Sequence, residues 1–577
     1  MEKVRQKKAI VVGAGAGGIA TAARLAKAGF DVTVLEKNSF TGGRCSLIHH
    51  EGYRFDQGPS LLLLPKLFRE TFYDLDTSLE AEGVELLRCP TNYNVWFADG
   101  ESFELSTDLA RMKHQIERWE GKGGFERYLA WLGEAHRHYE LSVSDVLHKN
   151  FTTWWDLANP WFVRTGLKLH PLHSIWNRAS RYFWTDRLRR VFTFATMYMG
   201  MSPFDAPATY SLLQYTELAE GIWYPKGGFH AVLQALVNVS ERFGVKYRLN
   251  TPVKQVLTLP DGKTATGVLL ESGERIDADI VVVNADLVYA YSNLFPQTTG
   301  NAKHSESLRK RDGSCSSISF YWSLDRKVPE LQTHNIFLAD EYRESFDAIF
   351  DRQELPKEPS FYINVPTRMD QDAAPPGCDA VIALVPVGHL YQSKGFVKSD
   401  DVGIPRDHDW AALVDRARHS VLSTISARTG AAPLSDFITH EIVNDPFTWE
   451  AKFNLDKGSI LGLSHSFFNV LKFRPSTRAR GFANAYFVGA STHPGTGVPI
   501  VLAGAKITAE QILGDLGIAA PWSTHPAQLE DLGVPQTRST SQLDRQTPPL
   551  ISVEAIALTA FFSLWLALLA YFWRPLL

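Results

Sequence analysis

Cysteine is scarce in this sequence of 577 residues, which holds only four. They are far apart in the chain and form no CxxC pair: Cys45, Cys89, Cys315 and Cys378. Neither a disulfide framework nor a structural zinc site is therefore expected. His170 and His173 have a spacing that could bind a metal, but no cluster of acids or thiols accompanies them, and Pro171 interrupts the helix that would align them. We predict no metal site.

The chain also lacks an excess of positive charge. Its 59 Lys and Arg residues face 63 Asp and Glu residues, a net charge of −4, and no basic stripe is dense enough to bind a run of phosphates, so nucleic acid is not an expected partner. The start of the sequence, MEKVRQKKAIVVGAG, leaves no room for an apolar signal region, so no amino-terminal targeting signal is expected. The composition is that of a globular chain, and its length fits two or three intertwined domains.

The amino-terminal segment has the pattern of a dinucleotide-binding turn. A short β-branched run at 9–12 is followed by the glycine-rich sequence GAGAGG and by an Ala- and Leu-rich stretch that predicts a helix to about residue 27. Gly13 makes the turn, Gly15 lets the backbone approach a pyrophosphate, and Gly18 lets the helix pack closely on the strand. The amino terminus of the helix then faces the anionic phosphates.

A second strand, predicted at 31–35, ends in Glu36, whose carboxylate is placed to accept hydrogen bonds from a ribose diol. NAD and FAD sites share this fingerprint, so the next residues have to distinguish them. They read Gly42-Gly43-Arg44. An E(x)5GGR extension resembles the FAD-binding module of the amine oxidase and carotenoid desaturase superfamily. FAD is therefore the expected cofactor, and NAD is the alternative.

This resemblance implies further cofactor residues. Gly43 and Arg44 are expected near the flavin and the pyrophosphate, with Ala14 and Lys37 also at the cofactor. In relatives, the residue at the position of Val253 meets the adenine through its backbone. The sequences FDQGP at 55–59 and YPKGG at 224–228 continue the resemblance.

A second glycine-rich signature lies nearly five hundred residues further on. The sequence NAYFVGASTHPGTGV at 484–498 matches the signature of the bacterial- and fungal-type phytoene desaturases. It predicts a strand at 486–488, a glycine loop and a helix from about 498 to 513, whose amino terminus can stabilise negative charge on a flavin. Ala490 stands where many flavin oxidases have an acid, as it does in the desaturases. The cofactor residues implied here are Gly489, Thr492, Gly497 and Val498.

The expected fold is α/β: a Rossmann-like FAD-binding domain of the GR2 flavoprotein type, a mixed-sheet substrate domain, a helical membrane-associating region and a carboxyl-terminal transmembrane helix. The FAD-binding domain is predicted to consist of three segments, at 1–75, 221–300 and 441–515. The helical substrate and membrane region is expected at 76–220, the substrate sheet at 301–440, a linker at 516–552 and the transmembrane helix at 553–574.

Two residues are candidates for acid–base catalysis. By family analogy, Asp156 lies where an acid/base residue has been proposed, but an Asp followed by Leu-Ala equally fits a helix N-cap. His493 has the side chain of a base, but it precedes Pro494 in a turn and equally fits a loop cap. Both roles stay open at this point.

The segment 151–162 contains five large aromatic residues, and Trp and Tyr side chains favour the border between water and hydrocarbon. It indicates either a half-embedded surface for substrate entry or an aromatic helical core. From Ala555 to Trp573 the chain is uncharged and mostly apolar, and at about 1.5 Å per residue a helix of this length nearly crosses a bilayer core. We expect a single tail anchor, with an interfacial or core helix as the alternative.

The resemblance thus predicts an oxidoreductase that desaturates a carotene, with phytoene as substrate and lycopene or 3,4-didehydrolycopene as product. Another flavin oxidase is one alternative, and a prenyl-lipid escort protein without catalysis is another. The expected partners are a long-chain carotene drawn from the membrane, the lipid bilayer, a quinone or oxygen as electron acceptor, and a second copy of the chain. The expected location is the endoplasmic reticulum or lipid-body membrane, with the catalytic domain in the cytosol.

Overall fold

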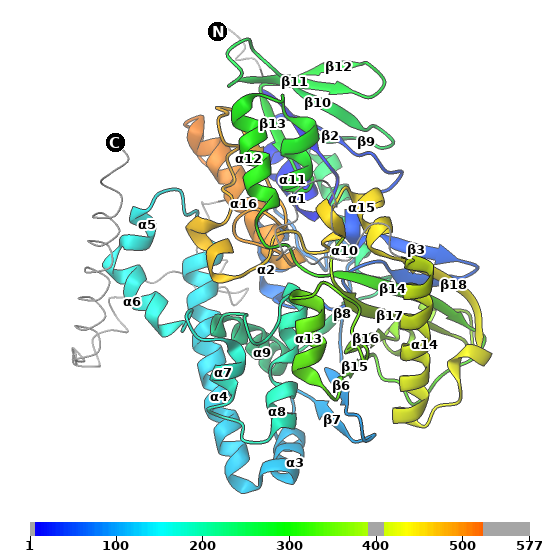
Figure 1. Cartoon of the computed structure of the whole chain (residues 1–577). Coiled ribbons are helices and arrows are strands. Elements are labelled where there is room, and N and C mark those ends of the chain that lie inside the picture. Colours follow the sequence, from blue (N-terminus) through cyan, green and yellow to red (C-terminus); the bar gives the residue numbers. More distant parts are fainter. Residues whose placement is uncertain (1–5, 391–408, 523–577) are drawn as a thin grey trace. The chain divides into compact units, whose positions relative to one another are not determined.

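The computed structural model describes residues 6–390 and 409–522 (Figure 1). The predicted strand–turn–helix is present, since β1 (Lys8–Val12) leads into α1 (Ala16–Lys27) and then β2 (Asp31–Leu35). Ala9 and Val11 pack on one face of β1, and Ile10 and Val12 pack on the other. The strand is therefore buried on both faces, as in a parallel sheet that is covered on each side.

β1 lies at the centre of a five-stranded sheet in which every neighbouring pair is parallel. The order is β19 (Ala485–Phe487), β13 (Ile280–Val283), β1, β2 and β9 (Lys246–Arg248). Three distant regions of the sequence therefore build one sheet, and the Rossmann-like α/β prediction is confirmed.

Helices cover one face of this sheet. Four of them share its hydrophobic cluster: α1, α2 (Pro65–Tyr73), α10 (His230–Arg242) and α16 (Val498–Asp515). The other face packs against a smaller antiparallel sheet and two helices: β10 (Val253–Thr258), β11 (Ala265–Leu270), β12 (Arg275–Asp277), α11 (Leu287–Tyr289) and α12 (Thr299–Arg309).

A second large sheet has seven strands. Its order is β18 (Ile438–Asn444), β14 (Ser316–Leu324), β17 (Asp379–Val387), β16 (Phe361–Asn364), β15 (His334–Phe337), β6 (Tyr93–Trp96) and β7 (Ser102–Leu105). The β15–β6 pair is parallel and the others are antiparallel, so the predicted mixed sheet is confirmed. Helix α14 (Trp410–Thr429) covers it with Leu413, Ala417, Val421 and Ile425, which lie four residues apart on one helix face.

The segment 76–220 is mainly helical, as expected, but it also supplies β6 and β7. In β6, Tyr93 and Val95 are buried while Asn94 and Trp96 are less so, an alternation with the period of a strand. The helices of this segment are α3 (Leu109–Glu120), α4 (Lys122–Ser142), α5 (Trp155–Ala158), α6 (Pro160–Lys168), α7 (Ile175–Ala179), α8 (Asp186–Val191) and α9 (Leu212–Tyr215), drawn in cyan and green-blue in Figure 1.

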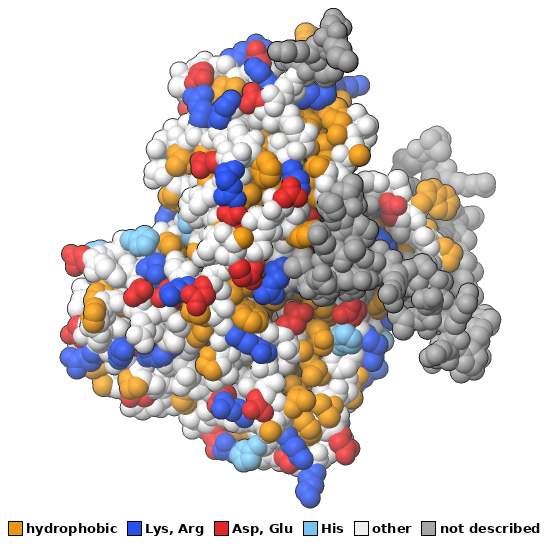
Figure 2. All heavy atoms as spheres, turned by 180° about the vertical axis from the view of Figure 1, so that it is seen from behind, with side chains coloured by type: hydrophobic (Ala, Val, Ile, Leu, Met, Phe, Trp, Pro, Cys, Tyr) orange, Lys and Arg blue, Asp and Glu red, His pale blue; other side chains and the backbone are white. Residues whose placement is uncertain are grey.

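The remaining elements connect these regions. Two short antiparallel pairs are formed, one by β3 (Leu47–His50) with β4 (Tyr53–Asp56) and one by β5 (Leu86–Arg88) with β8 (Trp223–Pro225). Helices α13 (Tyr342–Phe350) and α15 (Pro446–Phe453) lie in the later half of the chain. On the face shown in Figure 2, Lys and Arg side chains are interspersed with Asp and Glu side chains.

Within residues 6–390 and 409–522, no helix is long and apolar enough to cross a bilayer. The predicted transmembrane helix at 553–574, and all but the first residues of the predicted linker, lie outside the described residues, so both stay predictions. The exact domain boundaries likewise stay predictions.

Candidate functional site

The first glycine turn lies at the carboxyl end of β1. Gly13 has φ +100°, a backbone conformation that favours glycine, and its N–H donates to Leu35 O at 2.8 Å. A Cβ at Gly18 would lie 2.1 Å from the carbonyl oxygen of Gly13. Gly18 thus allows the start of α1 to approach β1 closely, which is the role predicted for it.

Asn284 connects this turn to the second glycine loop. It follows β13, and its backbone N–H donates to Val12 O at 2.8 Å. With the side-chain amide oriented to satisfy both of its ends, its oxygen accepts from Gly15 N and Gly18 N at 3.2 Å, and its nitrogen donates to Val488 O at 3.1 Å. One side chain therefore joins the loops that follow β1 and β19.

The prediction from sequence missed Asn284 as a site residue. The available signal was its position, since it directly follows a buried strand of a parallel sheet, at the edge where such sheets bind ligands.

Glu36 lies at the end of β2 with 6% of its surface exposed. One carboxylate oxygen accepts from Ala14 N at 2.8 Å, and the other accepts from the backbone and side-chain nitrogens of Asn38 at 2.9 Å. A carboxylate can accept about four hydrogen bonds, so one acceptor position is left for a ribose hydroxyl. The carbonyl of Glu36 accepts from Thr251 N at 2.8 Å, which brings Val253, at the start of β10, into the same neighbourhood.

The side chain of Lys37 binds elsewhere. Its Nζ donates to Ala451 O and to Asn454 Oδ1, both at 2.8 Å, at the end of α15. A contact between Lys37 and a cofactor would therefore use its backbone.

The Gly-Gly-Arg sequence packs directly on the first turn. Gly42 N donates to Ala14 O at 2.8 Å, and a Cβ at Gly43 would lie 3.3 Å from Gly15 Cα. Arg44 donates to Ile460 O, and burial lowers the pKa of its guanidinium. This places one partly buried positive charge beside the turn that is predicted to hold a pyrophosphate.

Asp286 is the acid that faces Arg44. Burial raises the pKa of Asp286 to about 6, and repulsion by Asp456 adds to the increase, while the backbone N–H of Tyr289 and the charge of Arg44 oppose it. Its carboxylate also caps α11 through Val288 N and Tyr289 N, both at 3.0 Å.

Asp56 joins the two shorter stretches that carried the resemblance. Its carboxylate accepts from Tyr224 Oη at 2.8 Å and from Phe229 N at 2.6 Å, and burial raises its pKa. The sequences at 55–59 and 224–228, far apart in the chain, therefore meet at one buried acid. A Cβ at Gly58 would lie 2.5 Å from Arg44 O, so the first of these stretches also lies against the Gly-Gly-Arg sequence.

In the second loop, Gly489 has φ +130° and a Cβ there would lie 3.2 Å from the Asn284 side chain. Thr492 Oγ1 donates to Gly489 O at 2.9 Å, which closes the loop on itself. Gly497 has φ +97° and directly precedes α16, whose first residue is Val498. The amino terminus of α16 thus lies at the end of this loop, with its unpaired N–H groups.

Arg474, which the prediction from sequence missed, holds the second loop in place. It is 2% exposed and donates to five backbone carbonyls, those of Leu463, Ser464, Asn469, Ala490 and Thr492. Burial lowers its pKa to about 10, so the guanidinium stays charged at neutral pH.

Two histidines flank the loop, and each has one ring nitrogen without a partner among the described residues. His493 Nε2 lies 2.7 Å from Lys149 O, so Nε2 carries the proton and Nδ1 is a free acceptor. His465 Nε2 accepts from Thr496 N at 3.1 Å, so Nδ1 carries the proton and is a free donor. Burial lowers the pKa of His493 to about 4 and that of His465 well below its usual value, so both rings are neutral.

Asp156 lies on the short helix α5. Its carboxylate accepts from Thr153 N at 2.7 Å, but the N-cap residue of α5 is Trp154, whose side chain makes no capping hydrogen bond. The preceding Trp154 is 60% exposed. The N-cap alternative considered for Asp156 is wrong, because Asp156 is the second residue of α5 and Trp154 is the N-cap, and its catalytic role stays a prediction.

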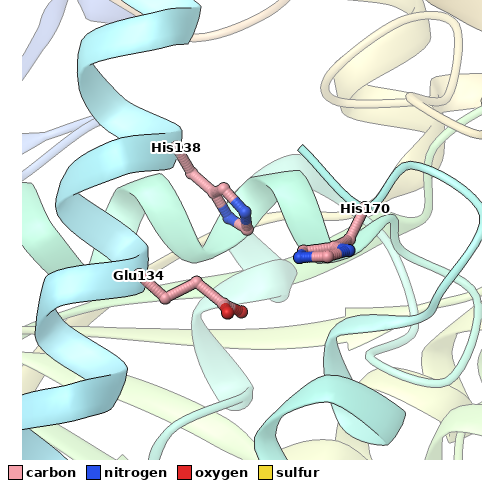
Figure 3. Close-up of side chains that lie close together, drawn as sticks. All are labelled: Glu134, His138 and His170. Carbon is pink, nitrogen blue, oxygen red and sulfur yellow. The ribbon is translucent and has the colours of Figure 1, made fainter. Parts of the chain in front are cut away.

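Glu134, His138 and His170 form a cluster that has the composition of a metal site (Figure 3). Two of its three residues, Glu134 and His138, are already bonded within the protein. Glu134 forms an ion pair with Arg178 and accepts from Tyr182 Oη at 2.8 Å. His138 binds Ser211 Oγ at 2.7 Å and Lys168 O at 3.1 Å, so its Nε2 carries a proton.

The residues present fit a bound dinucleotide. The first glycine turn brings together backbone without side chains, the amino terminus of α1 and the acid Glu36. The second glycine loop, joined to it by Asn284, adds the amino terminus of α16 and two histidine ring nitrogens without a partner among the described residues. Gly13, Gly15, Gly18, Glu36 and Arg44 would hold the diphosphate and ribose. The loop 489–498 would hold the flavin.

The fold and the site together define an FAD-dependent oxidoreductase. The model of the family "Flavin containing amine oxidoreductase" matches residues 16–376. A phytoene desaturase of Neurospora crassa is 66% identical over 535 residues, covering 91% of this chain and 88% of its own. A "zeta-carotene-forming phytoene desaturase" of Myxococcus xanthus is 38% identical, covering 88% and 94%. Among solved structures, an oxidoreductase from Methanosarcina mazei has a TM-score of 0.57 at 16% identity, covering 87% of this chain and 100% of its own.

The chain belongs to the phytoene desaturases within the flavin-containing amine oxidoreductase family. The predictions of FAD as cofactor and of an oxidoreductase that acts on CH–CH donors are thereby confirmed.

Proposed function

We propose that this enzyme removes hydrogen from phytoene in several steps and releases lycopene or 3,4-didehydrolycopene. The observation that carries the proposal is the 66% identity with the Neurospora crassa phytoene desaturase over nine-tenths of the chain. The number of desaturation steps is a separate part of the proposal, because relatives differ in their product. The Myxococcus xanthus relative is named for a less desaturated product, zeta-carotene.

Each step breaks two C–H bonds on neighbouring carbons and forms one C=C bond. Bound FAD supplies the acceptor for the hydride. The chain positions the cofactor through its glycine turns, Glu36 and Arg44, and the neutral rings of His465 and His493 are available to it or to the substrate. A proton must leave the neighbouring carbon, and Asp156 and His493 remain proposed acceptors.

A hydrocarbon substrate agrees with the interior beside the site. The cluster between the helical segment and the seven-stranded sheet is dominated by aromatic and aliphatic side chains, among them Tyr93, Phe194, Met199 and Leu213. Transfer of a hydrocarbon from water to such an apolar lining is favourable, and the lining offers few groups that could bind a charged amine.

We further propose that the enzyme takes its substrate from a lipid bilayer through the segment that carries α5 and α6. Trp155 is 82% exposed, Trp154 is 60% exposed and Phe468 is 69% exposed. Trp154 contacts the ring of Phe473, at 5.4 Å between centroids, so these aromatics belong to one surface. Exposed aromatic side chains of this kind favour the interface between water and lipid.

The tail helix at 553–574 would add a second attachment to the membrane, and oxygen or a membrane quinone would take the electrons. The cytosolic placement and self-association also stay proposals.

The direct test is to incubate the purified chain with FAD and phytoene-loaded liposomes and to record product spectra. We expect new absorption bands of a longer conjugated system, and none when FAD is omitted. FAD-loaded protein that leaves phytoene unchanged in liposomes would contradict the proposed substrate.

A further inference from the structure

The stretch of chain between α5 and α8 carries positive charge and contains no acid. From residue 157 to residue 185 the sequence has no Asp and no Glu, although the whole chain has more acidic than basic residues, 63 against 59. Because the net charge of the chain is −4, this excess of positive charge is local. Four positions in the stretch carry a basic side chain: Arg164, Lys168, Arg178 and Arg181.

Three of these four cations have no acidic partner in the described part of the chain. Arg178 is the exception, since its guanidinium forms an ion pair with the buried carboxylate of Glu134. Arg164, Lys168 and Arg181 are exposed, and no ion pair of the described residues includes them. Charges that the protein leaves uncompensated at its surface attract a partner of opposite charge.

The three unpaired cations lie close together. Arg164 and Lys168 are four residues apart on α6 and therefore share one face of this helix. The pKa of His170, two residues further on, is lowered first by burial and then by nearby positive charges, among them that of Arg181, while Glu134 opposes the decrease. The end of α6 and the segment after α7 thus contribute their cations to one region of the surface.

A fourth unpaired cation lies beside the exposed aromatic side chains. Lys472 donates to Thr152 O, in the segment that leads into α5, and it belongs to no ion pair of the described residues. The next residue, Phe473, contacts the ring of Trp154. Lys472 therefore lies at the aromatic surface that is proposed to contact the bilayer.

Exposed apolar side chains are interspersed with these cations along the chain. Val163 on α6 is 49% exposed, and Leu172, in the turn after α6, is 71% exposed. Helices α5 and α6 are in contact with each other (Figure 1), and the ring of Phe151 packs on that of Phe162 at 5.1 Å between centroids. A surface of this composition can place its apolar side chains in lipid while its long basic side chains reach the headgroups.

The acids nearest to this surface in the sequence leave its charge positive. Asp186, the first acid after the stretch, forms an ion pair with Arg190. Glu134 is paired with Arg178. Asp156, on α5, accepts a hydrogen bond from the backbone of Thr153 and is the one acid of that helix. Four unpaired cations therefore stand against a single unpaired carboxylate on α5.

We propose that the surface formed by Arg164, Lys168, Arg181 and Lys472 binds the phosphate groups of anionic lipids, so that the enzyme selects negatively charged membranes. This inference deepens the proposed uptake of substrate from a bilayer and rests on it. The exposed Trp, Val and Leu side chains favour a lipid surface over a soluble polyanion, which has no apolar interior to receive them. The attraction acts only near the headgroups, since the Debye length is about 8 Å at physiological ionic strength.

Sedimentation with vesicles that contain no phytoene tests this preference. The FAD-loaded full chain is mixed with vesicles of phosphatidylcholine alone, or of phosphatidylcholine with added phosphatidylserine. We expect wild type to bind the anionic vesicles about 100-fold more tightly at low salt, because each Lys or Arg near an anionic surface contributes a factor of about five. Added salt should reduce this preference.

The test variant removes three of the charges: Arg164→Gln, Lys168→Gln and Arg181→Gln together. It should lose about 100-fold in binding to anionic vesicles and keep the weaker binding to neutral vesicles. The matched control removes three exposed cations elsewhere, Lys263→Gln, Lys303→Gln and Lys327→Gln together. Lys263 lies between β10 and β11, Lys303 on α12 and Lys327 after β14. The control should bind both kinds of vesicle as wild type does, and both variants should keep the FAD stoichiometry of wild type.

Four results would overturn the proposal. These are equal binding of wild type to neutral and anionic vesicles at low salt, wild-type binding to anionic vesicles by the test variant, an equal loss in the control, and binding of soluble inorganic polyphosphate as tight as that of anionic vesicles. Failure of the proposed function is distinguishable from each of them. A wild type that selects anionic vesicles and leaves phytoene unchanged contradicts the desaturase proposal and supports the lipid preference, whereas conversion of phytoene without any preference for anionic vesicles does the reverse.

Discussion

Replacing Gly18 by alanine should separate folding from cofactor binding at the first glycine turn. The new Cβ would lie 2.1 Å from Gly13 O, whereas real Cβ atoms essentially never come closer than 3.0 Å. The contact is with backbone, so no side chain can rotate away, and the start of α1 has to move by about 1 Å. This shift moves the N–H groups that would bind the diphosphate.

The size of the effect follows from opposing contributions. Alanine gains about 1 kcal/mol over glycine inside a helix, and overpacking costs about 1 to 3 kcal/mol, so the protein without FAD should lose no more than about 2 kcal/mol. Weakening one or two charge-assisted hydrogen bonds to the diphosphate costs about 3 kcal/mol, which corresponds to about 100-fold in FAD affinity. FAD titration and thermal unfolding with and without FAD measure the two quantities separately.

Gly133 provides the matched control. It also lies inside a helix, α4, but nothing lies within 4 Å of an added Cβ. Gly133→Ala should keep FAD affinity and gain up to about 1 kcal/mol in stability. If Gly18→Ala binds FAD as tightly as Gly133→Ala does, the close approach of α1 to the turn does not matter for the cofactor, and the reasoning is wrong.

Three further outcomes are expected. Arg24→Met should lower the free energy of unfolding by about 3 kcal/mol in urea, because it leaves the buried carboxylate of Asp74 with one cation fewer. Wild type should lose stability relative to Glu217→Gln as pH rises from about 4.5 to about 8, by up to about 5 kcal/mol in calorimetry, because only the unfolded chain ionises this acid in that range. Replacing Trp154 and Trp155 by serine should lower binding to liposomes about 100-fold in sedimentation assays, since two exposed rings lose their contact with lipid.

Each of these outcomes has its own control. Arg275 forms an ion pair with Asp277 that is 60% and 70% exposed, so Arg275→Ala should change stability by less than about 0.5 kcal/mol. Leu259 is 45% exposed and directly follows β10, a strand that lies away from α5 in Figure 1, so it should tolerate serine without loss of liposome binding. Equal losses in Leu259→Ser and the tryptophan variant would contradict a specific membrane surface. A pH-independent difference between wild type and Glu217→Gln would show that this acid ionises normally.

The sequence was most informative where backbone conformation itself is the function. Gly13, Gly15 and Gly18 could be assigned to their positions because a strand, a tight turn and a helix in this order leave few alternatives. The second loop at 489–498 was predicted to return to the same place, and the hydrogen bonds of Asn284 show how it does so.

The sequence was least informative where a side chain matters through its surroundings. Arg474 and Glu217 belong to no local pattern, and what distinguishes them is burial by elements distant in the sequence. Asp156 shows a further limit, since its local sequence fitted both an N-cap and a catalytic acid, and only the structure shows that α5 already begins at Trp155. The sequence also did not predict strand β6. Its four residues are too few to establish an alternation of apolar and polar positions within an aromatic, mainly helical segment.

The position of Asn284 also bears on how the protein is made. The chain leaves the ribosome from its amino terminus, so the turn at Gly15 emerges long before its partner strand β13, and β19 with Val488 comes later still. A nascent or truncated chain that ends before residue 485 contains the complete first glycine turn but lacks β19 and the second glycine loop at 489–498. FAD should therefore bind late in biosynthesis, and only chains that extend through the second glycine loop should bind it.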